Sequence, residues 1–574
     1  MTETGVVAYF SMEIALESAM PTYAGGLGVL AGDMLRSAAD LEVPMVAVTL
    51  LHRQGYFYQH LDAHGHQTEE PVHWSVDDYL APLVPRVTVQ VAGRPVHIRA
   101  WRYQVRGVTG FQVPVYLLDT DVSENAPDDR TLTHVLYGGD SAYRLGQEIV
   151  LGLGGVRLLR ALGYRHITRF HMNEGHSALL VLALMEEQLA AFGPGAMVTP
   201  EIIEAVRAQC VFTTHTPVPA GHDQFPSELA RYVLGAPYCD WLQLCDQATG
   251  LNMTDLALHS AQFINGVAMK HSEISRGMFP GYPIHSITNG VHAMTWTSAP
   301  FQALYDQYLP GWRHDNFMLR YAIGMPGAAI WAAHQDAKRA LVTAVNHTTN
   351  AGFNQDVLTL GFARRATAYK RAGLLFHDLS RLRAIAEQRG PLQVVFAGKA
   401  HPRDAEGKEV IHAVHEARDA LQGGVSVAYL PNYDMDLGKL VCAGVDVWLN
   451  TPLPPHEASG TSGMKAALNG VPSLSVLDGW WIEGHVEGVT GWSIDDGASP
   501  SSLTTAQELD ARHAAGLYTK LAEQVLPCFY QDRERFISIM RSTVMLNGAF
   551  FHTQRMVWQY LHNAYRLPVG QQNQ

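Results

Sequence analysis

Short, continuously apolar stretches recur along this chain, and each leads into Gly, Asn or His and then into a helical pattern. Continuous rather than alternating apolar residues are typical of strands in parallel sheets, which are buried on both faces. The repeated strand-then-helix order predicts doubly wound α/β layers, in which ligands bind beyond the carboxyl ends of the strands. The clearest stretches are at residues 167–180, 210–217, 286–292, 357–365, 392–401 and 445–452.

The length of the chain and the positions of these stretches predict two large lobes and a C-terminal helix. A chain of 574 residues exceeds what one hydrophobic core needs. The strand–helix pattern pauses after residues 289–296, so we expect an N-terminal lobe over 1–295 and a C-terminal lobe over 296–550. Residues 86–101 alternate apolar and polar side chains around an Ala-Gly-Arg turn, which predicts an inserted antiparallel hairpin. Residues 551–574 contain an amphipathic pattern, which predicts a helix that packs back on the body.

The composition argues against several classes of protein. Hydrophobic residues make up 47% and charged residues 17% of the chain, as is typical of a folded globular protein. A net charge of −13 argues against nucleic-acid binding, so a bound anion has to meet a local basic cluster. The most apolar run, residues 178–185, is far shorter than the ~20 residues of a membrane span. The first residues show no secretion signal.

The five cysteines point to a reducing compartment. Their number is odd, and their spacing fits neither a metal site nor a CxxC motif. We therefore expect reduced thiols and a cytoplasmic location. The cysteines are Cys210, Cys239, Cys245, Cys442 and Cys528.

The stretch EASGTSGMKAALNG, residues 457–470, places one lysine, Lys465, where a Ser/Gly/Thr-rich loop enters a short helical pattern. A helix N-terminus carries partial positive charge, so we expect this position to favour the neutral amine. A neutral amine is a nucleophile toward carbonyls, including the aldehyde of pyridoxal phosphate. The amides and hydroxyls of the same loop can receive a phosphate. A glycine-rich turn with a solvated lysine explains the stretch equally well.

Four cations follow a predicted strand within eight residues, although the chain is acidic overall. Arg offers a planar fork that suits phosphate oxygens, and Lys adds a point charge. The cluster therefore predicts an anion site at the strand end; the alternative is a solvated basic helix face. The four cations are Arg364, Arg365, Lys370 and Arg371.

Three further features are less specific. The glycine-rich stretch at residues 23–32 allows close approach of the backbone to a ligand, and we interpret it as a loop over a sugar or phosphate rather than a dinucleotide fingerprint. His171, Glu174 and His176 are residue types that bind zinc, but their spacing puts the histidines off one helical face, so we predict no metal site. Tyr433 either borders an aromatic cofactor or lies in a surface turn.

With these residues in place, the chain resembles the α-glucan phosphorylases, which are the glycogen, starch and maltodextrin enzymes. The family pattern E-A-S-G-T-x-x-M-K-x-x-L-N-G matches residues 457–470 in order. The pattern K-R-x-x-x-Y-K-R matches residues 364–371, with arginine in the first position. The matches span nearly the whole chain in the family's order. The shorter ones are Thr288-Asn289-Gly290 with Trp296, GGLG at 25–28, GKA at 398–400 and T-x-H-T at 213–216.

The resemblance implies an α/β fold of the glycosyltransferase-B type, with two Rossmann-like lobes and the active site in the interlobe cleft. It implies reversible phosphorolysis of a terminal α-1,4-linked glucose of maltodextrin or glycogen to glucose 1-phosphate, with retention. Lys465 would carry pyridoxal 5′-phosphate as a Schiff base, and the cofactor's phosphate would lie against the substrate phosphate. The lack of an obvious hydrolase-type carboxylate pair agrees with this reaction. The implied partners are α-glucan, inorganic phosphate and glucose 1-phosphate, with a homodimer as the default assembly.

The resemblance also assigns roles to individual residues. Arg365 and Lys370 would hold the substrate phosphate with the Gly26 amide, and the His215 carbonyl would stabilise charge at the anomeric carbon. The implied catalytic residues are Lys465, Arg365, Lys370 and His215. The implied cofactor residues are Lys465, Arg364, Thr461, Ser462, Tyr433 and Trp296. The implied substrate residues are Gly25, Gly26, Leu27, His176, Asn289, Tyr369, Glu457, Ser459 and Gly460, and no metal is implied.

Some positions depart from the family pattern. Ala24 replaces the usual asparagine before the glycine loop, residues 366–368 are smaller than usual, and Ser462-Gly463 replaces Gly-Asn or Ser-Asn. The family-like residues begin at 9–16, so we expect a short, unregulated form without the phosphorylation segment and nucleotide-effector site.

Two rival functions remain at this stage. One is a nucleotide-sugar-dependent glucan synthase, in which Lys465 would contact phosphate and bind no cofactor. The other is an inactive glucan-binding protein, against which the intact set of Arg365, Lys370 and Lys465 argues.

Overall fold

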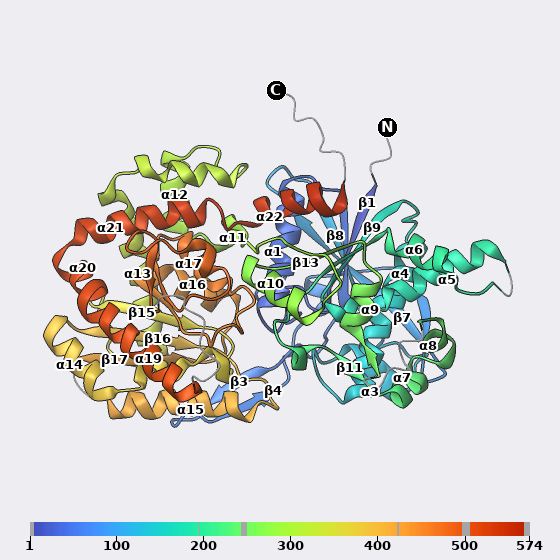
Figure 1. Ribbon diagram of the computed structural model, residues 1–574, viewed down its shortest axis with the longest axis horizontal. Coiled ribbons are helices and arrows are strands. Elements are labelled where there is room, and N and C mark those ends of the chain that lie inside the picture. The colour runs from blue at the N-terminus through green and yellow to red at the C-terminus, as the bar shows by residue number, and fades with distance from the viewer. Residues whose placement is uncertain (1–4, 194–195, 243–249, 422–423, 496–504, 567–574) are drawn as a thin grey trace. The chain divides into compact units, whose positions relative to one another are not determined.

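The computed structural model describes residues 5–193, 196–242, 250–421, 424–495 and 505–566, which divide into two units (Figure 1). Unit 1 comprises Met1–Phe57, Pro71–Thr288 and Gln554–Gln574, and unit 2 comprises Tyr58–Glu70 and Asn289–Thr553. Each unit contains a parallel sheet with helices, so the α/β class expected from the sequence is confirmed. The sequence pattern places the division at 295/296, whereas the structure divides at 288/289 and assigns residues 58–70 to unit 2.

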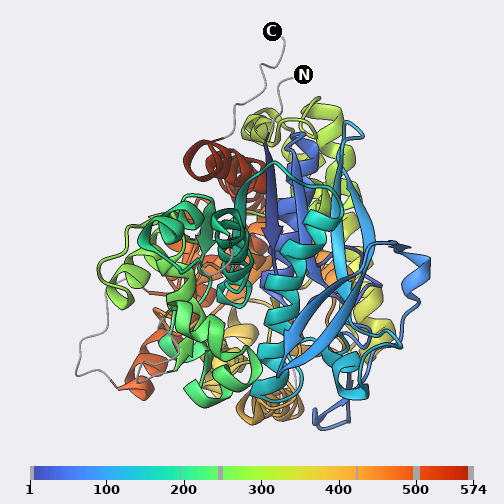
Figure 2. The ribbon, with the colours of Figure 1, turned by 90° about the vertical axis from the view of Figure 1, so that its right-hand side faces the viewer.

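Among the described residues of unit 1, ten strands form one sheet in the order β14-β13-β10-β9-β1-β2-β8-β7-β5, with β6 paired to β7. The strands from β14 to β8 pair in parallel, and the other three add an antiparallel edge. The predicted hairpin is present, because β6 and β7 pair across Ala92 and Gly93, both of which have positive φ. In Figure 2 the blue strands run alongside the cyan helices of this unit.

The strands of this sheet are β1 (Val6–Phe10), β2 (Met45–Leu50), β5 (Ala81–Pro82), β6 (Val87–Val91), β7 (Arg94–Arg106), β8 (Gln112–Asp119), β9 (Ile167–Asn173), β10 (Cys210–Thr213), β13 (Phe263–Gly266) and β14 (Ile284–Ser286). β11 (Gln224–Phe225) and β12 (Leu251–Asn252) form a separate pair. The helices are α1 (Gly26–Asp40), α2 (Pro127–Arg130), α3 (Ser141–Ile149), α4 (Gly155–Ala161), α5 (Leu180–Phe192), α6 (Pro200–Arg207), α7 (Ser227–Val233), α8 (Ala236–Leu242), α9 (Met253–His259), α10 (Met269–Met278) and α22 (Thr553–Tyr560).

Alternate residues of β1 belong to different hydrophobic clusters, because helices cover both faces of the sheet. Ala8 and Phe10 pack with residues of α4, α5 and α9. Val7 and Tyr9 pack with residues of α1 and with Met556 of α22, the C-terminal helix. Burial on both faces is the physical reason that these strands read as continuous apolar stretches.

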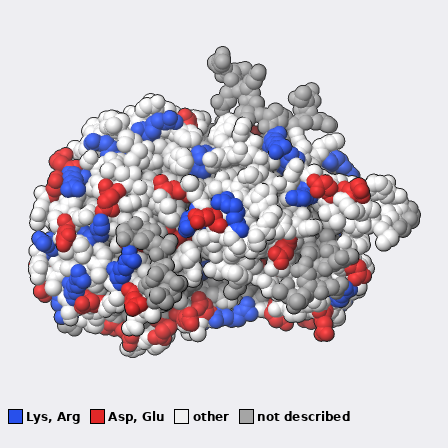
Figure 3. Space-filling model, viewed as in Figure 1, with Lys and Arg blue, Asp and Glu red and all other residues white. Residues whose placement is uncertain are grey.

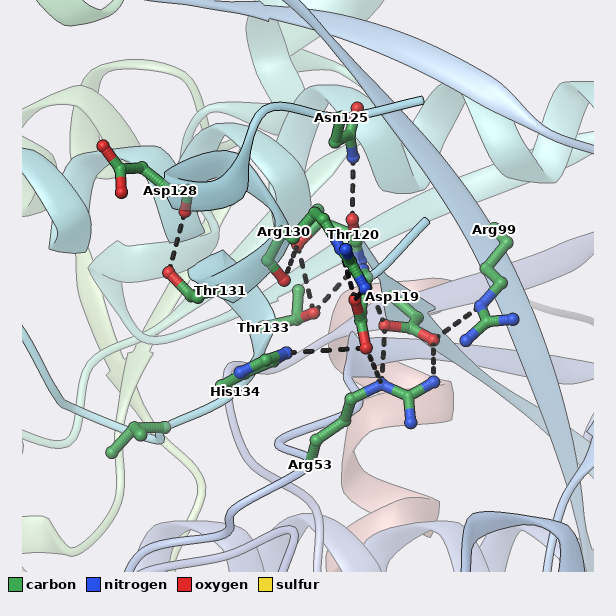
Figure 4. A network of polar contacts seen from close by, with 12 residues as sticks. Arg53, Arg99, Asp119, Thr120, Asn125, Asp128, Arg130, Thr131, Thr133 and His134 are labelled. Atoms are coloured by element: carbon green, nitrogen blue, oxygen red, sulfur yellow. Dashed lines mark hydrogen bonds and ion pairs between the residues drawn. The ribbon is translucent and has the colours of Figure 1, made fainter. Parts of the chain in front are cut away.

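A buried carboxylate, Asp119, closes the end of β8 (Figure 4). It accepts hydrogen bonds from Arg53 Nη2 at 2.6 Å, from Arg99 Nε at 2.7 Å and from the indole N–H of Trp101 at 3.0 Å. Burial would raise the pKa of Asp119, but the paired Arg53 outweighs burial and holds the pKa below its usual value. The two arginines also line a cavity of about 500 Å³, together with Asp77.

Among the described residues of unit 2, six parallel strands form a sheet in the order β17-β16-β15-β18-β19-β20. They are β15 (Leu358–Ala363), β16 (Leu392–Ala397), β17 (Val425–Leu430), β18 (Val447–Asn450), β19 (Ser473–Ser475) and β20 (Gly491–Ser493). β3 (Tyr58–Leu61) and β4 (Gln67–Glu70) form an antiparallel pair. The helices are α11 (Ala293–Trp296), α12 (Ala299–Tyr308), α13 (Gly327–Thr349), α14 (Leu379–Arg389), α15 (Ala405–Ala420), α16 (Met435–Gly444), α17 (Ser462–Ala467), α18 (Trp481–Gly484), α19 (Ala506–Lys520), α20 (Leu526–Gln531) and α21 (Arg533–Ser542).

A fully buried ionic cluster joins α13 to this sheet. Asp446, which precedes β18, contacts Lys338 Nζ at 2.5 Å and His334 Nε2 at 2.8 Å. It also accepts the backbone N–H of Thr359 in β15 at 2.7 Å. Every charge of the cluster is paired and hydrogen-bonded, so no isolated charge is buried. The cluster thereby fixes the position of α13 against the sheet.

The structure bears on two expectations from the sequence, which concern the oxidation state of the cysteines and membrane-spanning segments. Cys239 is disulfide-bonded, so the expectation that every thiol is reduced is wrong; Cys245 lies outside the described residues. The free cysteines Cys210, Cys442 and Cys528 are buried. Among the helices of the described residues, none has both the length and the apolar character that crossing a membrane requires.

Candidate functional site

The predicted residues of unit 2 centre on Glu457, a buried carboxylate in the loop between β18 and α17. Glu457 Oε2 accepts a hydrogen bond from Arg364 Nη2 at 2.7 Å, and both of its oxygens contact Lys370 Nζ, at 2.7 and 2.6 Å. Arg364 directly follows β15, and Lys370 ends a short 3-10 turn, Ala368–Lys370. The carboxyl ends of two neighbouring strands therefore bring these three charges together, as expected for a parallel sheet.

Two cations on one carboxylate leave an excess of positive charge in a buried place. Burial would raise the pKa of Glu457, but Arg364 and Lys370 outweigh burial and hold the pKa below its usual value. Glu457 is therefore ionised, and the three groups carry a net charge of about +1. On the face shown in Figure 3, Lys and Arg lie interspersed with Asp and Glu, so this local cluster rather than the overall field can attract an anion.

The other two members of the basic cluster have different environments. Arg365 is exposed. Arg371 donates to the Thr451 carbonyl at 3.0 Å and pairs with Asp510 at 2.7 Å, so it anchors neighbouring segments. The alternative of a solvated helix face does not describe Arg364 and Lys370, because both are buried and paired with Glu457.

Lys465 is buried in α17, with its Nζ 3.8 Å from the centroid of the Trp296 ring. It lies in the last turn of this short helix, so the expected placement at a helix N-terminus is wrong, and its neutral form stays a prediction. A side chain added at Gly438 of α16 would meet the Tyr433 hydroxyl at 2.9 Å and the Trp296 ring at 3.6 Å. Gly438 therefore lets two aromatic side chains pack closely against α16, and one of these, Trp296, adjoins the lysine.

The loop before Lys465 offers several polar groups. Ser459 Oγ is buried and has no hydrogen-bond partner among the described residues, so it can bind a ligand. Gly460 has a φ of +78°, and Thr461 is the residue before α17. Ser462 Oγ accepts a hydrogen bond from the Trp448 indole at 3.2 Å. Of these hydroxyls, that of Ser459 is the best placed to receive a new partner.

Two more predicted residues of unit 2 lie at the ends of this group. Asn289, the first residue of the unit's second segment, is buried. Tyr369 is partly buried, and Lys370 Nζ lies 4.5 Å from the centroid of its ring. The tyrosine thus packs against the cation that pairs with Glu457.

In unit 1, the predicted glycine loop leads into helix α1, which begins at Gly26. Glu13, which sequence reasoning missed, accepts the backbone N–H groups of Ala24 at 2.6 Å and Gly25 at 3.2 Å. Its other oxygen accepts the Tyr137 hydroxyl at 2.7 Å. A carboxylate thus fixes Ala24 and Gly25 at the positive end of the helix. Residues 26–32 of the stretch interpreted as a loop are helical, with Gly26 and Leu27 as the first residues of α1.

Alanine substitutions should distinguish Gly28, which is closely packed, from Gly26, which is not. A Cβ at Gly28 would meet Glu13 and Tyr23 at 2.7 Å, so Gly28→Ala is expected to destabilise the protein by about 1–3 kcal/mol through overpacking. A Cβ at Gly26 meets nothing within 4 Å, so Gly26→Ala should leave stability unchanged or slightly higher. Urea unfolding measures both, and equal destabilisation by the two substitutions would contradict this assignment.

The predicted histidines of unit 1 belong to a hydrogen-bond network at the carboxyl ends of β9 and β10. His215 donates its backbone N–H to Glu174 at 2.8 Å, and its Nε2 contacts Asn173 Oδ1 at 2.7 Å. His176 accepts the backbone N–H of Met12 on Nε2 at 3.2 Å, and burial, with the charge of Arg144, lowers its pKa to about 3. Both imidazoles are neutral, since burial lowers the pKa of His215 as well, with nearby histidines adding to it.

The structure also reveals partners that no sequence motif indicated. Glu13 and Glu174 fix the two predicted loops of unit 1, and Asp478 in unit 2 accepts the backbone N–H of Glu457 at 2.9 Å. The signal that could have found Glu13 is the stretch YFSMEIAL at 9–16, where a carboxylate stands among apolar residues. Asp478 stands in an ordinary Asp-Gly turn and carries no comparable signal.

Known proteins resemble this chain over nearly its whole length. Residues 236–490 match the Phosphorylase family, described as carbohydrate phosphorylase. A maltodextrin phosphorylase of Thermococcus litoralis is 38% identical over 97% of this chain and 70% of that protein. The chain belongs to the carbohydrate phosphorylase family. A glycogen phosphorylase of Mycobacterium tuberculosis is also 38% identical, over 97% of this chain and 70% of that protein. One of Aquifex aeolicus is 34% identical over 97% of this chain and 86% of that protein.

The match to the family's own model covers the predicted residues of unit 2. Its predicted residues, from Asn289 to Lys465, all lie within the matched residues 236–490. The predicted residues Gly25, Gly26, Leu27, His176 and His215 of unit 1 lie outside that match, and the roles of the predicted residues of both units remain predictions.

Proposed function

We propose that this carbohydrate phosphorylase cleaves a terminal α-1,4-linked glucose from maltodextrin or glycogen with inorganic phosphate and releases glucose 1-phosphate. The observation that carries the proposal is the buried group of Arg364, Lys370 and Glu457, which carries an excess positive charge. Such a group attracts and orients an oxyanion, while the Glu457 carboxylate is available to sugar hydroxyls. The relatives named maltodextrin and glycogen phosphorylase support this substrate class.

We also propose pyridoxal 5′-phosphate as the cofactor, held covalently by Lys465. The residues present fit this group: Lys465 is buried beside the Trp296 ring, and Trp296 and Tyr433, both packed against Gly438, are aromatic side chains suited to border a flat ring. When bound, the cofactor supplies a phosphate that exchanges a proton with the substrate phosphate. The chain's own contribution is to exclude water from the lysine and to keep cations near two phosphates that would otherwise repel each other.

The residues of the two units have complementary roles in this proposal. In unit 2, Arg364, Arg365 and Lys370 hold phosphate groups, and Glu457, Ser459 and Gly460 bind sugar hydroxyls. In unit 1, the amides of the glycine loop bind phosphate and His215 faces the sugar. We propose that the units are the two Rossmann-like lobes of a glycosyltransferase-B fold, with the substrate between them. Retention of configuration at the anomeric carbon belongs to the same proposal.

Phosphorolysis assays test this function against its rivals. Purified protein is mixed with maltose, maltotriose, longer maltodextrins or glycogen, with and without phosphate, and products are separated by chromatography. We expect glucose 1-phosphate that forms only when phosphate is present. Glucan extension from a nucleotide sugar, without phosphorolysis, would favour the glucan synthase. Glucan binding without turnover, with pyridoxal phosphate added, would favour the inactive binding protein.

Arg365 provides a more specific test of phosphate binding. The substitution Arg365→Ala should cost about 3 kcal/mol of transition-state stabilisation, or about 100-fold in kcat/KM, because a charged donor is lost beside the phosphate. Steady-state kinetics with varied phosphate measure this effect. Arg339→Ala, which removes an exposed arginine of the same unit, is the matched control. An unchanged dependence on phosphate would remove Arg365 from the site.

A further inference from the structure

The loop that carries Glu457 is hydrogen-bonded to a second buried carboxyl group, that of Asp478. This residue lies between β19 and α18. Asp478 Oδ2 accepts the backbone N–H of Glu457 at 2.9 Å, and Oδ1 accepts that of Gly479 at 2.9 Å. The backbone N–H of Trp480 in turn donates to the Ser459 carbonyl at 2.9 Å. Three consecutive residues, 478–480, thus fasten the segment that contains Glu457 and Ser459.

The packing at Gly479 shows how closely these two segments approach. Gly479 has a φ of +56°, and a Cβ there would meet the Ser459 carbonyl oxygen at 2.5 Å and Glu457 Cγ at 3.0 Å. The contact is therefore backbone against backbone, and a displacement of one segment displaces the other.

We propose that Asp478 is a positioning residue, which holds the Glu457 segment so that the Glu457 carboxylate meets Arg364 and Lys370 and presents itself to the sugar. The inference rests on the proposed function, because it assigns Glu457 to sugar binding. Asp478 touches neither substrate nor cofactor in this account and acts through the backbone of Glu457.

The ionisation of Asp478 gives this role a pH dependence. Burial, followed by the charge of Glu457, raises the pKa of Asp478 to about 7, although two backbone N–H groups and Lys370 oppose the rise. Three charged groups act on Asp478. They are Glu457, whose backbone N–H it accepts, Lys370 in the turn after β15, and Arg371. An ionised carboxylate accepts on both oxygens, whereas a protonated carboxyl places an O–H among N–H donors. As the pH falls through about 7, Asp478 gains a proton and its hold on the Glu457 segment weakens.

Glucose binding tests the inference, because glucose has no group that ionises near neutral pH. Isothermal titration with glucose, in the absence of phosphate, should show affinity that falls severalfold from about pH 8 to about pH 6. Asp478→Asn should bind glucose about tenfold more weakly at the higher pH and show no such pH dependence, since the carboxamide presents an N–H to an N–H. The same pH dependence in wild type and Asp478→Asn would overturn the inference.

Two further variants separate positioning from general loss of structure. Gly479→Ala pushes on the same segment without changing an ionisable group, so it should weaken glucose binding at each pH and keep the pH dependence. Asp495→Asn removes a neighbouring carboxylate that accepts the N–H of Leu477, and it should bind glucose as wild type does. Loss of the pH dependence in Asp495→Asn would overturn the inference. Wild-type protein that forms glucose 1-phosphate but binds no glucose, or binds it equally at every pH, would also overturn the inference, whereas protein that forms no glucose 1-phosphate would refute the proposed function instead.

Discussion

Lys465→Ala is expected to abolish phosphorolysis and to leave the purified protein without covalently bound pyridoxal phosphate. The lysine is buried, and its Nζ lies 3.8 Å from the centroid of the Trp296 ring. Alanine has no amine that can attach an aldehyde, so added cofactor should not restore activity. The measurement combines a glucose 1-phosphate assay with the absorption spectrum of the protein.

The matched control for this substitution is Lys439→Ala. Lys439 lies on α16 in the same unit, is partly exposed and pairs with Asp436. Its loss should leave both the spectrum and the activity as in the wild type, since exposed ion pairs contribute about 0–1 kcal/mol. Substantial phosphorolysis by Lys465→Ala would contradict the assignment of the cofactor to this lysine.

Glu457→Ala is expected to destabilise the protein by about 3–5 kcal/mol, because it leaves two buried cations without their shared partner. Phosphate should restore part of this loss, since an oxyanion that binds Arg364 and Lys370 stabilises the folded state by mass action. The same substitution should reduce phosphorolysis by about 1,000-fold or more, because sugar contacts are lost together with the geometry of the cations. Urea unfolding with and without phosphate measures the first two effects.

Asp510→Ala is the control for Glu457→Ala. Asp510 pairs with Arg371, another cation of the same cluster, but its side chain is 39% exposed. We expect a loss of about 1 kcal/mol or less, with no special protection by phosphate. If phosphate protects neither wild type nor Glu457→Ala, the three charges do not form an anion site.

The continuous apolar strands were sufficient to predict the α/β class, because burial on both faces of a parallel sheet dictates that pattern. They also predict ligand binding beyond the carboxyl ends of the strands, and the structure brings Arg364 and Glu457 together there because they follow neighbouring strands. The division between units was harder to predict. Residues 58–70 cross to unit 2 as a short hairpin, which has no composition that distinguishes it from a loop.

The environment of individual side chains could not be derived from the sequence. The position of Lys465 in the last turn of α17 depends on where a six-residue helix begins, and such boundaries are the least certain feature of a sequence pattern. Glu13 and Asp478 act on backbone N–H groups of distant segments, 11 and 21 residues away, so no local motif marks them. The disulfide of Cys239 likewise leaves no trace in the cysteine count.

Peptide mapping of borohydride-reduced protein, taken from a preparation that is releasing glucose 1-phosphate from maltodextrin and phosphate, tests the whole account most directly. We predict that mass spectrometry finds a reduced pyridoxal phosphate adduct on the peptide that contains Lys465. Glucose 1-phosphate formed by a preparation in which that lysine carries no adduct would contradict it.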